Sequence, residues 1–156
     1  RVVALRKNII NQLEAEDTLS ALIEFEDGYL GTIEVTTAAK EDFEASISIV
    51  GSKGMATVGG IALNKIELWK FGKDPEKEKK IKRNFSEVVI NGYGNSHIRQ
   101  INNIILNFKS KIKKPTISVS EAVKSLEIVH SLYASIEKNK WINIKDKSIS
   151  SKLGKK

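Results

Sequence analysis

The stretch that decides the fold is residues 17–37, DTLSALIEFEDGYLGTIEVTT. Over 19–25 apolar side chains alternate with polar ones, Leu22 being the exception, which is the pattern of a half-buried strand. Residues 26–28 supply turn chemistry, with a glycine where a positive φ is expected, and the alternation resumes over 29–37. We therefore predict a β-hairpin over this stretch.

Further extended segments lie on both sides of this hairpin. Residues 43–50, 55–58 and 66–71 are rich in strand-forming side chains, and a glycine-rich turn at 51–54 joins the first two. The chain also opens with a strand-like stretch at 1–5. Because the strands precede any helix, an antiparallel sheet is favoured, with five strands between 17 and 71.

The apolar spacing changes beyond Gly92, where isoleucine and phenylalanine side chains recur at intervals of three and four residues. This spacing predicts an amphipathic helix, and Pro115 ends it. Asn95 or Ser96 is placed to cap the exposed N–H groups at its start.

A second helix is predicted over 118–136, which begins with the S-x-x-E capping spacing and carries one apolar face. Residues 141–144 could return to the sheet edge, and 145–156 are polar and lack periodicity, which is typical of a mobile tail. We therefore predict one α+β domain over 1–144, a mostly antiparallel open sheet with helices packed on one face, followed by the tail.

Composition limits the chemistry that the chain can carry. Its 156 residues are 40% hydrophobic, which is enough for one core. It has no cysteine and only two histidines, so we expect no disulfide and no metal site. No membrane-spanning run or export signal is visible, and a cytoplasmic protein is expected. The only methionine is Met55, so the sequence reads as a fragment.

The net charge of +7 is unevenly distributed. Residues 1–72 carry a net charge of −4, whereas the tail over 140–156 carries +5. Lysines at 77–83 alternate with glutamate, which favours a solvated loop over a phosphate-binding track. The alternative function is a stand-alone basic module that binds nucleic acid or another polyanion.

The sequence motifs of nucleotide-binding sites and of serine acyl-transfer enzymes are absent. No G-x-G-x-x-G, P-loop or G-x-S-x-G sequence occurs, so we assign no catalytic and no cofactor-binding residue. The most suggestive stretch is 93–97, YGNSH, which places a carboxamide and an imidazole in a glycine-flanked loop at a helix start. Such a place suits an anion or a hydroxyl group, although a surface histidine in the first helical turn explains it as well.

Several local sequences, in this order, resemble the C-terminal domain of the Gfo/Idh/MocA family of NAD(P)-dependent oxidoreductases, over about residues 1–144. They are Glu16-Asp17-Thr18, the Phe25–Gly28 turn, the hairpin at Ile49–Gly54, the G-x-x-H helix at Gly94–Phe108, and Lys140-Trp141-Ile142. The fold implied is the C-terminal domain type of glyceraldehyde-3-phosphate dehydrogenase. An N-terminal Rossmann domain for NAD or NADP is implied as well, and this chain lacks it.

The resemblance also implies a role for the chain. In the family, one sheet face covers a sugar, nucleotide sugar or related polyol, and the other pairs subunits into a dimer or tetramer. The implied substrate-binding residues are His97, Asn95, Tyr93, Lys40 and Thr36. The chain alone is expected to be inactive, because the family's acid–base residues have no counterpart here.

Overall fold

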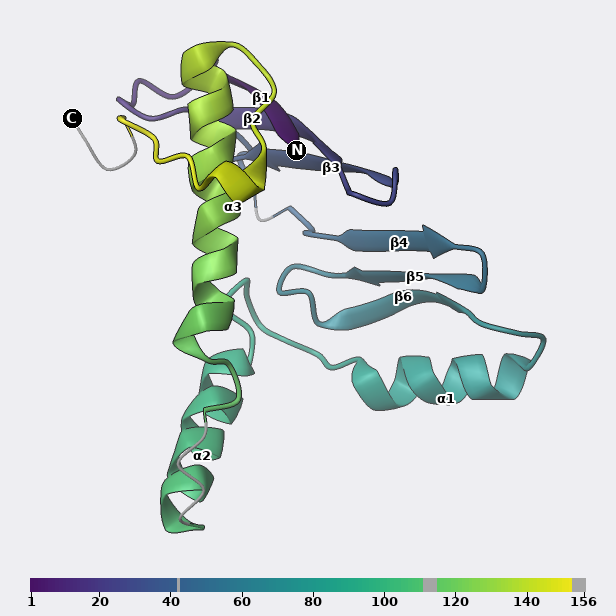
Figure 1. The fold of residues 1–156 in the computed structure, drawn as a ribbon. Coiled ribbons are helices and arrows are strands. Elements are labelled where there is room, and N and C mark those ends of the chain that lie inside the picture. The colour runs from purple at the N-terminus through teal and green to yellow at the C-terminus, as the bar shows by residue number, and fades with distance from the viewer. Residues whose placement is uncertain (42, 111–114, 153–156) are drawn as a thin grey trace. The chain divides into compact units, whose positions relative to one another are not determined.

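A computed structural model describes residues 1–41, 43–110 and 115–152 (Figure 1). The chain divides into two compact units, residues 1–39 with 114–156 and residues 40–113. The antiparallel α+β class predicted from the sequence is confirmed. The strands described, however, form two three-stranded sheets, one in each unit, rather than the single sheet that we expected.

The first sheet contains β1 (Val2–Lys7), β2 (Thr18–Glu24) and β3 (Leu30–Thr36), in the order β1-β2-β3. All its pairs are antiparallel, and the tip of the predicted β2–β3 hairpin turns at Gly28 with φ +81°. Alternation puts one row of side chains from each strand on the same face, where they can be buried together.

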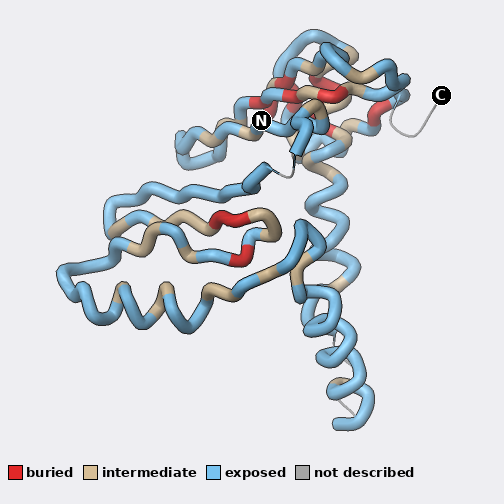
Figure 2. The backbone as a smooth tube through the Cα atoms, turned by 180° about the vertical axis from the view of Figure 1, so that it is seen from behind, coloured by how far each residue is buried: buried red, intermediate tan, exposed pale blue. Residues whose placement is uncertain are grey.

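Helix α3 (Val119–Lys138) covers that face of the first sheet. Small buried side chains allow close approach, and the Ala4 N–H donates to Ser135 Oγ at 3.2 Å. Figure 2 shows most of the buried residues in this unit. Its hydrophobic core consists of Val2, Ala4, Leu19, Ala21, Leu132, Ala134 and Ile142.

The ends of α3 follow the sequence prediction. Ser118 and Glu121 form a reciprocal capping box at the start, and Asn139 ends the helix in the left-handed conformation with φ +49°. The chain then returns to the sheet edge, since backbone hydrogen bonds of 2.8 and 2.9 Å join Val2 and Ile142. A short 3-10 helix, η1 (Ile144–Asp146), follows.

A buried carboxylate organises the loop between β1 and β2. Asp17 is fully buried, and its oxygens accept the N–H groups of Ile9, Ile10 and Asn11 at 2.7–3.0 Å. The hydrogen bonds from Asn11 and Ile10 outweigh burial and lower the pKa of Asp17 to about 2. The aspartate of the E-D-T sequence is therefore a structural anion.

The second sheet contains β4 (Ile47–Gly51), β5 (Gly54–Gly59) and β6 (Lys65–Lys70), again antiparallel and in sequence order. The predicted glycine turn joins β4 to β5. Gly54 has φ +152°, and a Cβ there would lie 2.1 Å from the Lys70 carbonyl oxygen, so only glycine fits.

The prediction of a solvated loop over 77–83 is wrong, because helix α1 (Pro75–Phe85) occupies this segment. Asp74 caps the helix by accepting the N–H groups of residues 76 and 77, and Pro75 suits the first helical position. Ion pairs one turn apart, Lys79 with Glu76 and Lys82 with Glu78, add local support. The helix buries no residue, which is why its sequence shows no core-facing pattern.

Helix α2 (Ser96–Lys109) lies where the isoleucine spacing predicts it. None of its described residues is buried within the chain, although its apolar side chains follow helical spacing. The tail prediction for 145–156 stays a prediction: residues 150–152 donate hydrogen bonds to Glu137, and residues 153–156 lie outside the described part.

Candidate functional site

The loop before α2, residues 91–95, adopts a backbone conformation that requires glycine at position 94. Gly94 has φ +59°, and a Cβ added there would lie 2.9 Å from the Cβ of Ala62. The N–H groups of Tyr93 and Gly94 both donate to Asn91, at 3.1 Å each, which closes a tight turn. The start of α2 therefore lies close to the turn between β5 and β6.

A pocket of about 300 Å³ lies at this junction. It is bounded by the turn before β6, the segment after α1 and the first turn of α2, all within the 40–113 unit. Its lining residues are Ala62, Leu63, Asn64, Asn84, Phe85, Ser86, Glu87, Gly94, Asn95, Ser96 and Arg99.

The pocket contains one charged pair, in which the Arg99 guanidinium contacts Glu87 Oε2. The same oxygen accepts a hydrogen bond of 3.4 Å from Asn95 Nδ2. Asn64 anchors the Glu87 backbone, since its Nδ2 donates to the Glu87 carbonyl at 2.7 Å and its own carbonyl accepts the Glu87 N–H at 2.9 Å. The pocket thus offers donors and acceptors together, as the hydroxyl groups of a sugar require.

The structure gathers three of the predicted site residues at this helix start. Asn95 lines the pocket, whereas Tyr93, which is 80% exposed, and His97, in the first turn of α2, are exposed and are not among the lining residues. Asn95 occupies the N-cap position but makes no side-chain cap hydrogen bond, because its amide reaches Glu87 instead.

The other two predicted residues lie elsewhere. Thr36 belongs to the unit that contains β1–β3, and its hydroxyl donates to the Asp17 carbonyl at 3.0 Å and accepts the Ala38 N–H at 3.1 Å. Lys40 is exposed in the 40–113 unit and does not line the pocket. A role in substrate binding stays a prediction for all five residues.

Three polar residues of the pocket are not among the residues predicted from the sequence. Asn64, Glu87 and Arg99 are far apart along the chain, and only Arg99 carried a usable signal, since it lies one helical turn after Asn95. Asn64 is 8% exposed, and its burial could not be inferred from a turn sequence.

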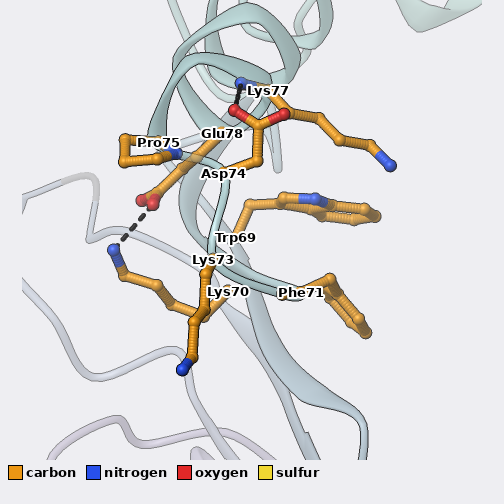
Figure 3. A pocket seen from close by; sticks show the side chains of 9 residues that line it. Trp69, Lys70, Phe71, Lys73, Asp74, Pro75, Lys77 and Glu78 are labelled. Atoms are coloured by element: carbon orange, nitrogen blue, oxygen red, sulfur yellow. Dashed lines mark hydrogen bonds and ion pairs between the residues drawn. The ribbon is translucent and has the colours of Figure 1, made fainter.

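A second, smaller pocket of about 140 Å³ lies between the end of β6 and the start of α1 (Figure 3). The ring centroids of Trp69 and Phe71 are 4.6 Å apart. The Trp69 indole N–H is buried without a hydrogen-bond partner among the described residues. Glu78 pairs with Lys70 at 2.6 Å, and the Asp74 carboxylate is engaged in capping. Lys70, Asp74 and Glu78 therefore support the start of α1.

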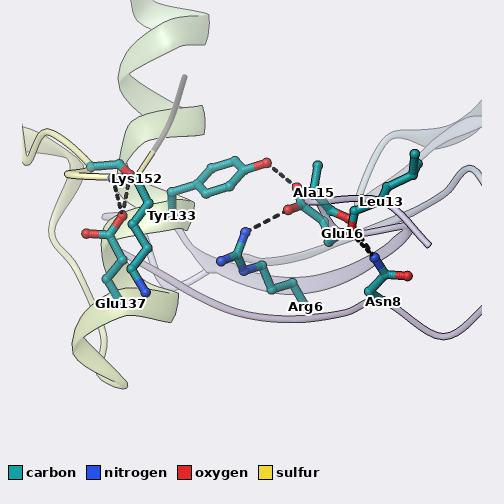
Figure 4. A network of polar contacts seen from close by, with 9 residues as sticks. Arg6, Asn8, Leu13, Ala15, Glu16, Tyr133, Glu137 and Lys152 are labelled. Carbon is teal, nitrogen blue, oxygen red and sulfur yellow. Dashed lines mark hydrogen bonds and ion pairs between the residues drawn. The ribbon is translucent and has the colours of Figure 1, made fainter. Parts of the chain in front are cut away.

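A polar network joins the loop before β2 to α3 (Figure 4). Glu16 accepts hydrogen bonds from the Tyr133 hydroxyl and, at 2.8 Å, from Arg6. Burial opposes ionisation of Glu16, but the Tyr133 and Arg6 hydrogen bonds lower its pKa overall, while burial and the Glu16 contact raise the pKa of Tyr133 to about 12. At neutral pH the pair is therefore a carboxylate and a neutral phenol, fixed as a structural link.

This antiparallel α+β architecture is that of the C-terminal domains of dehydrogenases of known structure. The chain belongs to the Gfo/Idh/MocA oxidoreductase family, because the model for that family's C-terminal alpha/beta domain matches residues 1–144. The resemblance seen in the sequence is confirmed.

Two similar solved structures are WlbA dehydrogenases in complex with NADH and UDP-GlcNAcA. The one from Bordetella pertussis is 31% identical, with a TM-score of 0.74 over 89% of this chain and 40% of that chain. The one from Chromobacterium violaceum is 28% identical, with a TM-score of 0.72 over 89% of this chain and 38% of that chain. A probable dehydrogenase from Thermotoga maritima, 16% identical with a TM-score of 0.65 over 93% of this chain and 43% of that chain, shares the fold.

The chain spans about two fifths of the length of these structures. No curated protein matches it. Among the described residues, no helix has the length and apolar character needed to cross a membrane.

Proposed function

We propose that this chain is the C-terminal domain of an NAD(P)-dependent dehydrogenase that acts on a sugar, nucleotide sugar or related polyol. The observation that carries the proposal is the 31% identity, over 89% of the chain, to a WlbA dehydrogenase bound to NADH and UDP-GlcNAcA. UDP-GlcNAcA is accordingly the first substrate to test.

The nicotinamide cofactor would belong to another domain of the parent protein. A dinucleotide site needs a glycine-rich strand-to-helix turn, and this sequence contains no G-x-G-x-x-G. When bound, the oxidised cofactor would supply the acceptor for a hydride from a sugar carbon, and the hydroxyl proton would pass to a base. The role of this chain is to orient the sugar through the pocket at the start of α2. The candidate substrate-binding residues are Tyr93, Asn95 and His97 near this pocket, together with Lys40 and Thr36. Correct placement of reacting groups can supply several kcal/mol of rate acceleration.

Self-association belongs to the same proposal. The face of the first sheet opposite α3 carries Val3, Leu5 and Leu22, of which Leu5 is 71% and Leu22 51% exposed. Exposed apolar patches on a sheet are typical of subunit interfaces. We propose that this face pairs subunits of a cytoplasmic enzyme.

The proposal is tested with the full-length parent protein, NAD or NADP, and a panel of nucleotide sugars that includes UDP-GlcNAcA. NADH or NADPH formation is expected with at least one sugar, and none with the 156-residue chain alone. A parent protein that binds neither cofactor nor sugar would refute the proposed activity.

The site is tested in the same assay with Asn95→Ala and His97→Ala, each of which is expected to raise KM or lower kcat. Gln100→Ala is the matched control, because Gln100 is an exposed polar residue of α2 that does not line the pocket. If all three variants have the same KM and kcat, Asn95 and His97 do not belong to the substrate site.

A further inference from the structure

Among the residues that the structure describes, the Glu87–Arg99 pair supplies the only charges that line the pocket at the start of α2. Both side chains reach solvent, with exposed fractions of 31% for Glu87 and 65% for Arg99. Ion pairs in contact with water are weak, because solvation compensates each partner when they separate. The pair can therefore open at little cost.

The backbone on both sides of the pair is fixed. Glu87 is tied to the buried Asn64 by two hydrogen bonds, and the neighbouring Ser86 Oγ accepts the Ile66 N–H at 2.9 Å. Arg99 lies in the first turns of α2, where its N–H bonds the Asn95 carbonyl. Opening the pair thus needs only a change of side-chain rotamer.

One carboxylate oxygen occupies the point where two donors from the start of α2 converge. Glu87 Oε2 contacts the Arg99 guanidinium and accepts from Asn95 Nδ2. The first turn of α2 has no acidic residue and no side-chain cap. The positive end of the helix dipole therefore adds to the positive electrostatic potential that the Arg99 and Asn95 donors create at this point. An oxygen of a ligand carboxylate or phosphate would be satisfied by the same groups.

We propose that Arg99 and Asn95 bind an anionic group of the substrate, and that Glu87 holds their position when the site is empty and competes with the substrate for it. This inference rests on the proposed function and deepens it, since it restricts the substrate class to sugars that carry a carboxylate or a phosphate. Arg99 is then a specificity-determining residue and Glu87 a built-in competitor.

The two partners of the pair are expected to act in opposite directions. In the full-length parent, Arg99→Gln should weaken binding of UDP-GlcNAcA by roughly tenfold or more, because it removes a charge-assisted hydrogen bond. Glu87→Gln should strengthen binding, because it removes the competing carboxylate. A merely structural ion pair would make both variants bind more weakly, and that result would overturn the proposal.

The two possible anion sources are separated by the choice of ligand. If Arg99 holds the sugar carboxylate, Arg99→Gln weakens binding of UDP-GlcNAcA and of free GlcNAcA but not of UDP-GlcNAc. If it holds the diphosphate, both nucleotides are weakened and free GlcNAcA is not. Arg83→Gln, an exposed arginine of α1 outside the pocket, is the matched control and should leave every Kd unchanged. Equal effects of Arg83→Gln and Arg99→Gln would also overturn the proposal.

Failure of the proposed function can be recognised separately. If the wild-type parent oxidises no sugar, that function fails, and inorganic phosphate then probes the anion site alone by calorimetric titration. Phosphate binding should be lost in Arg99→Gln and strengthened in Glu87→Gln. Absence of phosphate binding in both the wild type and Glu87→Gln would exclude the site.

Discussion

At the residue scale, Asp17 makes the stability of the protein depend on acid pH. Its folded-state pKa of about 2 lies below its ordinary value of 3.8, so its contribution is complete above about pH 4 and is lost as the pH falls through 2. We expect Asp17→Asn to destabilise the chain near neutral pH, with a difference from the wild type that shrinks near pH 2. Urea unfolding at both pH values measures this.

Asp27→Asn is the control for Asp17, since Asp27 is exposed in the β2–β3 turn. It should leave the unfolding midpoint unchanged at neutral pH. A constant difference between Asp17→Asn and the wild type across the acid range would contradict the assignment.

Alanine substitutions at Gly28 and Gly94 distinguish the cost of left-handed backbone strain from the cost of a steric clash. Gly28 has φ +81° with nothing near its Cβ direction, whereas Gly94 has φ +59° and a 2.9 Å approach to Ala62. Gly28→Ala should therefore cost only the left-handed strain of about 1–2 kcal/mol, and Gly94→Ala should cost more. The free energies of unfolding of the two variants are compared; equal values would show that the Ala62 contact can relax.

At the element scale, the helix starts differ in how they are capped. Ser118→Ala removes the capping box of α3 and is expected to cost about 1 kcal/mol of unfolding free energy. Asn95→Ala should cost less, because Asn95 makes no side-chain cap bond. Chemical unfolding of both variants checks the order, and the reverse order would refute it.

The C-terminal segment is held to α3 mainly through one carboxylate. Glu137 accepts the hydroxyls of Ser150 and Ser151 and the N–H groups of Ser151 and Lys152, and the Ser150 hydrogen bond is the largest cause that lowers its pKa to about 2. Glu137→Gln should therefore speed amide hydrogen exchange at residues 151 and 152.

Glu127→Gln is the control for this segment, since Glu127 meets Lys147 only at 3.8 Å and accepts none of these N–H groups. Its exchange profile at 151 and 152 should match the wild type. Unchanged exchange in Glu137→Gln would show that the carboxylate does not hold the segment.

At the scale of the whole molecule, the open face of the first sheet is proposed to pair subunits. Leu22→Glu places a charge in the middle of that face and should shift the parent protein toward monomers, because a charge is costly to bury in an apolar interface. Sedimentation of the wild type and the variant measures the shift. Val88→Glu, at an exposed apolar residue outside both sheets, should have no effect.

The sequence by itself determined most of the local elements of this protein, helix α1 being the exception. Alternation over 19–25 and 29–37, the glycine turn at 51–54 and the S-x-x-E spacing at 118–121 are short-range signals, and each strand, turn or helix start that they predict is present. These signals suffice because they depend on backbone sterics and on side chains only a few residues apart.

Only the tertiary structure decided how the strands divide into two sheets and which residues form the pocket. Alternation specifies which face of a strand is buried but not which strand lies beside it. Asn64, Glu87 and Arg99 meet through contacts between segments that are distant in the sequence, so their pairing has no local signature. Helix α1 buries no residue, so no apolar period marks it, and its local signals are the Asp74–Pro75 start and charged pairs one turn apart.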